Sequence, residues 1–185
     1  MKQKIVLSIM LSALLIAGGC GKNVEKLPVA GESVQSVTSP ILNTKGDKIG
    51  EVKLVDGIDG VTINIEAEGL TPGKHGIHIH EKAVCTAPDF KSTGAHFNPG
   101  HKEHGFDNPK GFHLGDLPNL EVDAEGKVSA EVTTALVTLK LGVENSLLDA
   151  DGSSIVIHEK VDDYKTDPAG DSGDRIACAV VKSGS

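Results

Sequence analysis

The chain has 185 residues and a formal net charge of −8 at pH 7. That length suits one domain with a short targeting region and is enough to bury a core. The acidic balance and the lack of a basic run argue against nucleic acid as a partner. With 22 glycines, few aromatic residues and no tryptophan, the composition favours short strands joined by turns over long helices.

The first twenty residues are typical of a bacterial export signal. Lys2 and Lys4 give a positive start, and residues 5–17 are apolar apart from two serines. This stretch is too short to cross about 30 Å of hydrocarbon as a helix. Ala17-Gly18-Gly19 precedes Cys20 and resembles a lipobox, the signal for lipidation of that cysteine, although Ala17 stands where leucine is usual.

We therefore expect residues 1–19 to be a lipoprotein-type signal peptide, Cys20 to carry the lipid, and residues 20–32 to form a flexible tether. The alternative is a plain cleaved signal peptide followed by an incidental cysteine. Cleavage before Cys20 would remove two lysines and no acidic residue, which changes the formal charge from −8 to −10. The lipid would place the domain on the outer face of the cytoplasmic membrane, or on an outer membrane or in a periplasm where these exist.

Two cysteines remain, Cys85 and Cys178. In an oxidising compartment they favour a disulfide that closes a long loop. The chain-entropy account gives such a bond about 4–5 kcal/mol of stabilisation. The alternative is a pair of free buried thiols.

Residues 33–185 carry the pattern of a domain built from short strands. Apolar side chains alternate with polar ones over 61–67, which predicts a strand with one buried face. We expect about eight strands and no long helix, hence an all-β antiparallel sandwich or barrel. One strand begins after residue 33, and the others lie near 48–55, 61–67, 75–81, 120–122, 128–132, 154–159 and 175–181.

Two long segments, 82–117 and 160–174, lack any periodicity. Loops of this length inside a compact domain usually serve function. The first loop holds three histidines and one aspartate that form a closed four-coordinate set, and such a set suits structural zinc. These residues are His96, His104, His113 and Asp116.

A second set of histidines lies on strands. In an extended strand His78 and His80 point to the same face, and His75 has the opposite parity, which predicts a structural role for it. Such a pair alone is more often solvated than ligated. With His158 from a distant strand, however, it offers an all-imidazole site that suits copper.

The sequence resembles the copper-zinc superoxide dismutases over about residues 34–182. The resemblance implies the eight-stranded Greek-key β-barrel of that family, with two long functional loops and one copper and one zinc ion per subunit. The segments that carry it are GIHIHE at 76–81, HFNP at 96–99, HG at 104–105, HLGDL at 113–117, HEK at 158–160 with DD at 162–163, and GDRIAC at 173–178.

The resemblance also implies a role for each residue. Copper would be held by His78, His80, His96 and His158, and zinc by His96, His104, His113 and Asp116. The ring of His96 would thus bridge the two ions. Asp162 would link a copper ligand to a zinc ligand and orient both rings. Cys85 and Cys178 match the intrachain disulfide of the family.

The implied activity converts superoxide to dioxygen and hydrogen peroxide through a Cu(II)/Cu(I) cycle, with zinc in a structural role. His96 would release copper and become protonated when copper is reduced, and Arg175 would guide the anion. The implied partner is the superoxide anion, beside the membrane expected from the lipid anchor. A homodimer is a further expectation, but the sequence does not decide the oligomeric state, because members of the family pair through different surfaces.

Two residues depart from the family pattern. His101 has no counterpart, and we expect it in solvent. Asp174 stands where a small neutral residue is usual, beside Arg175. If Asp174 faces the channel, its charge offsets part of the attraction, and Asp174→Ala should speed catalysis modestly at low ionic strength.

Two functions of other classes compete with catalysis. The first is a copper- and zinc-binding lipoprotein of the same fold that does not turn over. The second is a structural or adhesive β-sandwich, which would not require this array of histidines. A superoxide assay on metal-reconstituted protein, with His158→Ala beside the wild type, separates the three.

Overall fold

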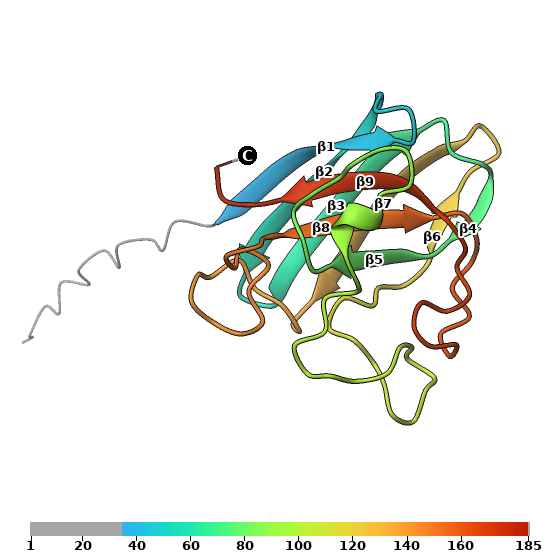
Figure 1. Cartoon of the computed structure of the whole chain (residues 1–185). Helices are drawn as coiled ribbons and strands as arrows, with labels where there is room; N and C mark the ends of the chain where they lie inside the picture. Colours follow the sequence, from blue (N-terminus) through green and yellow to red (C-terminus); the bar gives the residue numbers. More distant parts are fainter. Residues whose placement is uncertain (1–34, 185) are drawn as a thin grey trace, which may run out of the picture. The chain divides into compact units, whose positions relative to one another are not determined.

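The computed structural model describes residues 35–184. The predicted signal peptide, Cys20 and the tether lie outside this range. Nine strands and one short 3-10 helix make up the described part (Figure 1). Their bounds are β1 Ser36–Asn43, β2 Lys48–Gly57, β3 Gly60–Glu68, β4 Gly73–His75, β5 Ile77–His80, η1 Lys91–Thr93, β6 Leu120–Val122, β7 Lys127–Thr134, β8 Ser153–His158 and β9 Arg175–Val181.

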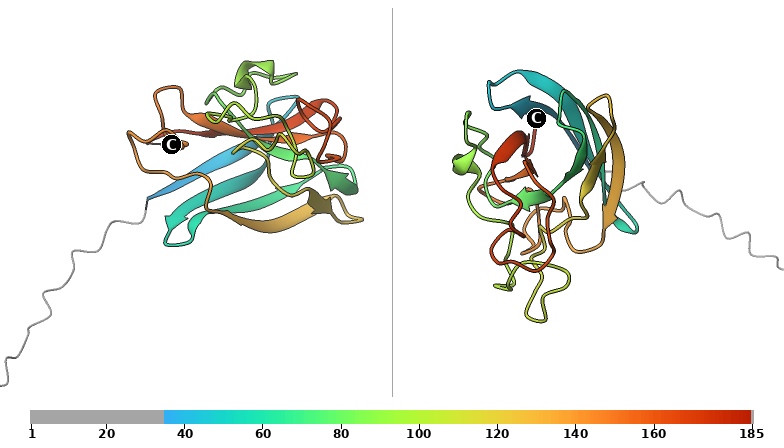
Figure 2. Two further views of the ribbon diagram at one scale, coloured as in Figure 1. Left: turned by 90° about the horizontal axis from the view of Figure 1, so that it is seen from below. Right: turned by 90° about the vertical axis from the view of Figure 1, so that its right-hand side faces the viewer.

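Seven strands form one antiparallel sheet in the order β5-β8-β9-β1-β2-β3-β7, and β4 pairs with β6 in a small second sheet. The large sheet curls around the main core (Figure 2). This arrangement confirms the all-β antiparallel fold expected from the strand pattern. No helix among residues 35–184 is long and apolar enough to span a bilayer.

The alternation in β3 has the predicted effect. Val61, Ile63 and Ile65 are fully buried in the core, while the residues between them reach the outer surface or its edge. In contrast, every residue of β5 and β8 is buried. Loops cover the outer face of these two strands, so the space between sheet and loops becomes a second interior.

The expectation of one strand over 75–81 was wrong, because the chain breaks at Gly76 into β4 and β5. Gly76 donates its N–H to Lys160 O (2.7 Å) and accepts from His158 N (2.8 Å). A Cβ at this position would lie 2.9 Å from Cβ of Ser172, so only glycine lets the loop approach so closely. The break moves the chain from the small sheet to the large one.

Three long connections leave the strands, at 81–119, 135–152 and 159–174, one more than the sequence indicated. The additional connection, 135–152, buries Leu139 and Leu147 completely in the main core. It therefore covers the core with its own apolar side chains. The two connections expected from the sequence carry the functional residues.

Candidate metal centre

The long loop 81–119 folds back along β5 and brings distant histidines together. Ile79 donates to Gly115 O at 2.8 Å and accepts from Phe97 N at 2.8 Å. These bonds set two isolated bridges, His80 opposite His96 and His78 opposite Asp116. Backbone pairing thus places loop ligands beside strand ligands.

Four buried imidazoles form the first group. Their ligand atoms lie within 4.8 Å of one another, and the group consists of His78, His80, His96 and His158. Each ring has one buried nitrogen without a hydrogen-bond partner among the described residues: His78 Nδ1, His80 Nε2, His96 Nε2 and His158 Nε2. Four such atoms in one place are costly unless an ion satisfies them, because buried polar atoms are almost always paired.

The second nitrogen of each ring in this group has a partner. His78 Nε2 lies 2.9 Å from Asp162 Oδ2, His80 Nδ1 lies 3.1 Å from Gly94 O, and His158 Nδ1 lies 3.3 Å from Gly173 O. Histidines that bind metals usually donate the other N–H to a carboxylate or a carbonyl in this way. The arrangement therefore aims the free nitrogens at a common point.

The second group surrounds one oxygen of Asp116. Asp116 Oδ1 lies 3.0 Å from His96 Nδ1, 3.0 Å from His104 Nδ1 and 3.2 Å from His113 Nδ1. The Nδ1 atoms of His96 and His113 are also 3.2 Å apart. Ligands about 2.0 Å from a tetrahedral zinc ion are separated by about 3.3 Å, so these four atoms fit a zinc site.

Backbone hydrogen bonds fix the orientation of Asp116. Its Oδ2 accepts from the N–H groups of Gly105 (2.9 Å) and His113 (3.0 Å), which leaves Oδ1 for the imidazoles. The ligand atoms of His78, His96, His104 and Asp116 also lie within 4.8 Å of one another, a set with His78 in place of His113. Because Nε2 of His78 is bonded to Asp162 and its free Nδ1 belongs with the first group, we assign His113, whose Nδ1 lies 3.2 Å from Asp116 Oδ1, to the second group.

The two groups share His96, which offers Nε2 to the first group and Nδ1 to the second. Asp162 provides a second link, because its Oδ1 lies 3.0 Å from His104 Nε2 and its Oδ2 bonds to His78. Both side chains of the latter pair are fully buried. The structure thus holds two adjacent donor sets in one rigid network.

Burial sets the charge of the first group. It lowers the pKa of His78 and His158 to about 4 and that of His96 to about 3, and it holds the pKa of His80 well below its ordinary value. These rings are therefore neutral at pH 7, which is the form that binds metal.

The second group pairs an ionised carboxylate with a histidine that holds its proton at pH 7 in the metal-free protein. Burial alone would raise the pKa of Asp116, but hydrogen bonds from His104, His113 and His96 hold it well below its usual range. Burial also opposes protonation of His104, yet hydrogen bonds to Asp116 and Asp162 raise its pKa to about 9. The pKa of Asp162 is lowered in turn by hydrogen bonds from His104 and His78, which outweigh its burial.

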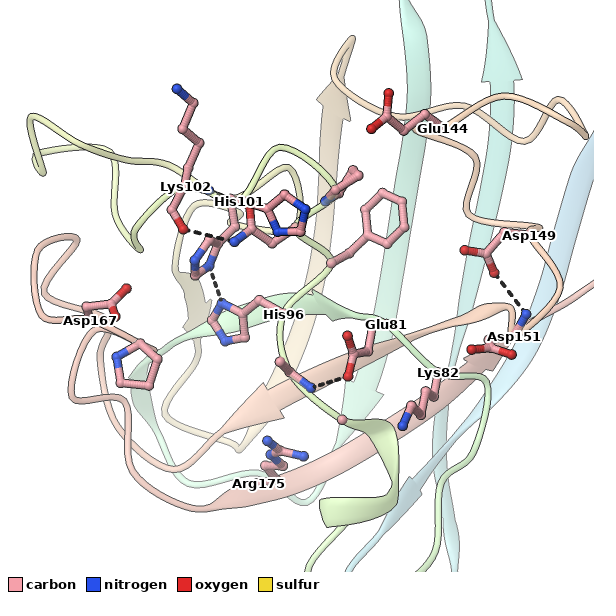
Figure 3. Close-up of a pocket in the computed structure, with 17 residues that line it drawn as sticks. Glu81, Lys82, His96, His101, Lys102, Glu144, Asp149, Asp151, Asp167 and Arg175 are labelled. Atoms are coloured by element: carbon pink, nitrogen blue, oxygen red, sulfur yellow. Dashed lines mark hydrogen bonds between the residues drawn. The ribbon is translucent and has the colours of Figure 1, made fainter.

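An open pocket leads to these groups, and His96 and Arg175 line it (Figure 3). Nη1 of Arg175 donates to Phe90 O at 3.0 Å and to Thr93 Oγ1 at 2.8 Å. Burial lowers the pKa of Arg175, but the ordinary pKa of a guanidinium is so high that the side chain stays charged at pH 7. The other charged residues of the wall are Glu81, Lys82, Lys102, Glu144, Asp149, Asp151 and Asp167.

Residues 48–181, most of the chain, match the protein family described as "Copper/zinc superoxide dismutase (SODC)". The chain belongs to the copper/zinc superoxide dismutase family. Superoxide dismutase [Cu-Zn] 1 of Aquifex aeolicus is 50% identical over 143 residues, which cover 77% of this chain and 85% of the relative. The superoxide dismutase-like protein YojM of Bacillus subtilis is 42% identical over 193 residues, covering 96% and 95%.

Solved structures of superoxide dismutases show the same fold. The SOD-like protein from Bacillus subtilis superposes with a TM-score of 0.76 at 46% identity, covering 78% of this chain and 97% of that one. The Cu/Zn superoxide dismutase from Brucella abortus superposes with a TM-score of 0.65 at 31% identity, and the match covers 80% of this chain and 99% of that one. Copper and zinc are the cofactors of this family, and the two donor groups of this chain fit them.

The remaining sequence predictions for this superoxide dismutase fold have clear outcomes. The Cys85–Cys178 disulfide is present. His75 is buried outside both groups, with Nδ1 2.7 Å from His158 O and Nε2 2.8 Å from Thr71 O; the predicted structural role holds, although the break at Gly76 rather than strand parity separates it from His78. His101 is exposed at the rim of the pocket.

The structure settles two points near Arg175 that the sequence left open or did not show. Asp174 is exposed and, together with Arg175, lines a surface pocket other than the one that leads to the imidazoles. Thr93, which the sequence analysis missed, is fully buried between Arg175 and His80. A lone threonine in an aperiodic loop carries no pattern, so only the fold could reveal it.

Proposed function

We propose that this protein is a superoxide dismutase that converts superoxide to dioxygen and hydrogen peroxide. In this proposal copper is held by His78, His80, His96 and His158, and zinc by His96, His104, His113 and Asp116. The observation that supports it best is the convergence of four unpartnered imidazole nitrogens beside a closed His₃Asp set. Bound copper would supply one-electron exchange, while zinc, which has no redox chemistry, would order the loop.

The residues of the chain account for the remaining requirements of the reaction. Superoxide is an anion, and the charged guanidinium of Arg175 at the pocket wall attracts it and offers hydrogen bonds. Two molecules of superoxide and two protons give one dioxygen and one hydrogen peroxide. His96 Nε2 can carry one of these protons, because its Nδ1 remains in the second group.

Asp162 acts by orientation in this mechanism. By accepting from Nε2 of His78 and of His104, it leaves Nδ1 of each ring as the ligand atom. The carboxylate thereby sets the direction of one ring in each donor group. No proton transfer through Asp162 is needed.

A non-catalytic copper- and zinc-binding lipoprotein is the second candidate. It is favoured by one observation, that a relative 42% identical to this chain is named superoxide dismutase-like. In this chain, however, all seven ligand positions are occupied by histidine or aspartate, and Arg175 lines the pocket. This combination supports turnover.

The decisive experiment measures superoxide decay by pulse radiolysis after reconstitution with copper and zinc, with metal content determined on the same sample. We expect fast decay with the wild type and loss of copper and activity with His158→Ala. His101→Ala is the matched control, because His101 lies at the rim of the same pocket and outside both groups. Full copper occupancy without catalysed decay would favour the second candidate.

We further propose that the protein is exported and lipidated at Cys20, on the residue pattern at 2–20. Mass spectrometry of the mature N-terminus should show a lipid-modified Cys20 in the membrane fraction. Cys20→Ser should release the protein from that fraction, and an unmodified mature N-terminus would contradict the proposal. Homodimer formation also stays a proposal, to be tested by light scattering on protein without the lipid.

A further inference from the structure

Thr93 occupies a junction between two functional side chains. It is the last residue of η1 and has no exposed surface. Its Oγ1 lies 2.8 Å from Arg175 Nη1, 3.2 Å from His80 Nδ1 and 2.9 Å from Phe90 O. The hydroxyl therefore contacts both the residue that attracts the anion and an imidazole of the first group.

The hydrogen-bonding capacity of the hydroxyl is fully used at this junction. A threonine hydroxyl has one donor and two acceptor positions. The donor serves Phe90 O. Arg175 can only donate, and His80 donates from Nδ1 when its free Nε2 binds a metal, sharing that one N–H between Thr93 Oγ1 and Gly94 O, so both acceptor positions of the hydroxyl are used.

We propose that Thr93 is a positioning residue that fixes Arg175 relative to His80, so that an anion can contact the guanidinium and the copper site together. This inference deepens the proposed function and rests on the assignment of His80 to copper. Arg175 keeps one further acceptor, Phe90 O at 3.0 Å, and His80 keeps Gly94 O at 3.1 Å. Loss of the hydroxyl should therefore loosen both side chains without removing either.

The proposed role of Thr93 concerns the contact between the guanidinium of Arg175 and a bound anion, not the long-range attraction of that anion. The charge of Arg175 acts over about 10 Å at 0.1 M salt and does not depend on Thr93. The direction of the guanidinium acts only at contact. Removal of the hydroxyl should therefore weaken the binding of a small anion at copper while the ionic-strength dependence of the association rate stays unchanged.

The test uses the copper- and zinc-loaded protein and azide as the anion probe. Thr93→Val removes the hydroxyl at nearly constant volume, and Thr93→Ser keeps it. Ser92→Ala is the matched control, because the Ser92 hydroxyl bonds only to Val84 O and Thr86 N within the same loop. The azide dissociation constant is read from the Cu(II) absorption, and the Cu(II) EPR spectrum reports on the ligand ring.

We expect Thr93→Val to raise the azide dissociation constant about three- to ten-fold, the net worth of about one ordinary hydrogen bond, because Thr93 acts only through Arg175 and His80, and we expect it to shift the Cu(II) EPR parameters. Thr93→Ser and Ser92→Ala should stay within about two-fold of the wild type. An unchanged azide constant in Thr93→Val with full copper content would overturn the proposal, and so would equal weakening in Thr93→Ser.

If valine disturbs folding, Thr93→Ala replaces Thr93→Val as the variant without the hydroxyl. An unchanged azide constant in Thr93→Ala, or equal weakening in Thr93→Ser, would then overturn the proposal. Thermal unfolding of each variant checks the fold. A wild type that binds copper and azide but does not speed superoxide decay would contradict the proposed function alone, since the azide comparison would still report on Thr93.

Discussion

Nε2 of His78 lies 2.9 Å from Oδ2 of Asp162, with both side chains fully buried. The other oxygen of Asp162 lies 3.0 Å from His104 Nε2, so one carboxylate orients a ring in each donor group. A carboxylate can accept from both N–H groups, whereas an asparagine side chain presents an amide NH₂ to one of them. Asp162 is therefore, beside the shared His96, a second residue through which the two groups influence each other.

We expect Asp162→Asn to lower the affinity for zinc and copper by about 10- to 100-fold, because one ring loses its acceptor. Competition with a chelator of known affinity measures this loss. Asp171→Asn is a suitable control, since Asp171 is exposed in the same loop. If Asp162→Asn binds both metals as tightly as the wild type, the carboxylate does not orient the rings.

Arg175 combines a charge with a forked set of donors. Arg175→Lys keeps the charge but loses the two bonds from one guanidinium nitrogen, and Arg175→Ala loses both features. We expect kcat/KM to fall about ten-fold or more in the alanine variant and less in the lysine variant. Pulse radiolysis at several ionic strengths measures this, and only the alanine variant should flatten the salt dependence.

Acidic side chains at the rim of the pocket oppose an incoming anion. Glu144 and Asp151 line the wall of the pocket that leads to the imidazoles, whereas Asp174 lines another surface pocket, which Arg175 borders as well. At low ionic strength we expect Glu144→Gln and Asp151→Asn to raise the association rate up to about two-fold, an effect that salt removes. Asp174→Ala should change it less. A larger effect at Asp174 would show that its charge acts through the protein and not along the pocket.

Much of this site could be predicted from the sequence, and the reason is local. Strand parity puts His78 and His80 on one face of β5, whereas His75 is excluded because the chain breaks at Gly76 and leaves it on β4. The loop ligands fall within a short aperiodic segment, so their grouping also follows from residue type and spacing. The family resemblance then added Asp162 and Arg175, which no periodicity marks.

Other features depend on contacts between distant segments. The break at Gly76 arises because Lys160 and His158 bond to its backbone, and neither partner is visible from the local pattern. The same is true of Thr93, whose partners Arg175 and His80 lie on separate strands. Position 174 shows the converse: Asp174 and Arg175 line one surface pocket together, but Asp174 is absent from the wall of the pocket that leads to the imidazoles, which Arg175 also lines.

The disulfide anchors the loop that holds Arg175. Phe90 packs with Val156 and Cys178 in a small second core, and the carbonyl of Phe90 accepts from Arg175. We expect the double variant with Cys85→Ala and Cys178→Ala to lose about 2–5 kcal/mol of unfolding free energy. Urea unfolding measures this.

The double variant should also bind azide more weakly, because the loop is released. Chemical reduction of the wild type should reproduce both effects. Loss of stability with unchanged azide binding would mean that the core around Phe90 holds Arg175 without the disulfide.

Acid should destabilise the metal-free protein well above the range of its carboxylates. Burial lowers the pKa of His78 and His158 to about 4 and of His96 to about 3, while an unfolded histidine titrates near about 6.5. Between these values the unfolded chain takes up protons that the folded chain does not. The stability is therefore complete above about pH 6.5 and is lost as the pH falls toward 4.

Within that pH window, each of these histidines should change the free energy of unfolding by about 1 kcal/mol per pH unit. Urea unfolding of the chelator-treated protein at pH 7, 6 and 5 measures the slope, which His158→Gln should reduce by about one quarter if the four buried rings, including His80, act equally. His101→Gln should leave it unchanged, because His101 is exposed. His104, raised to about 9, acts in the opposite sense above pH 6.5, so stability should also fall toward pH 9. A flat profile between pH 7 and 5 would mean that the buried rings accept protons in the folded state, and metal binding should then fail at the same pH.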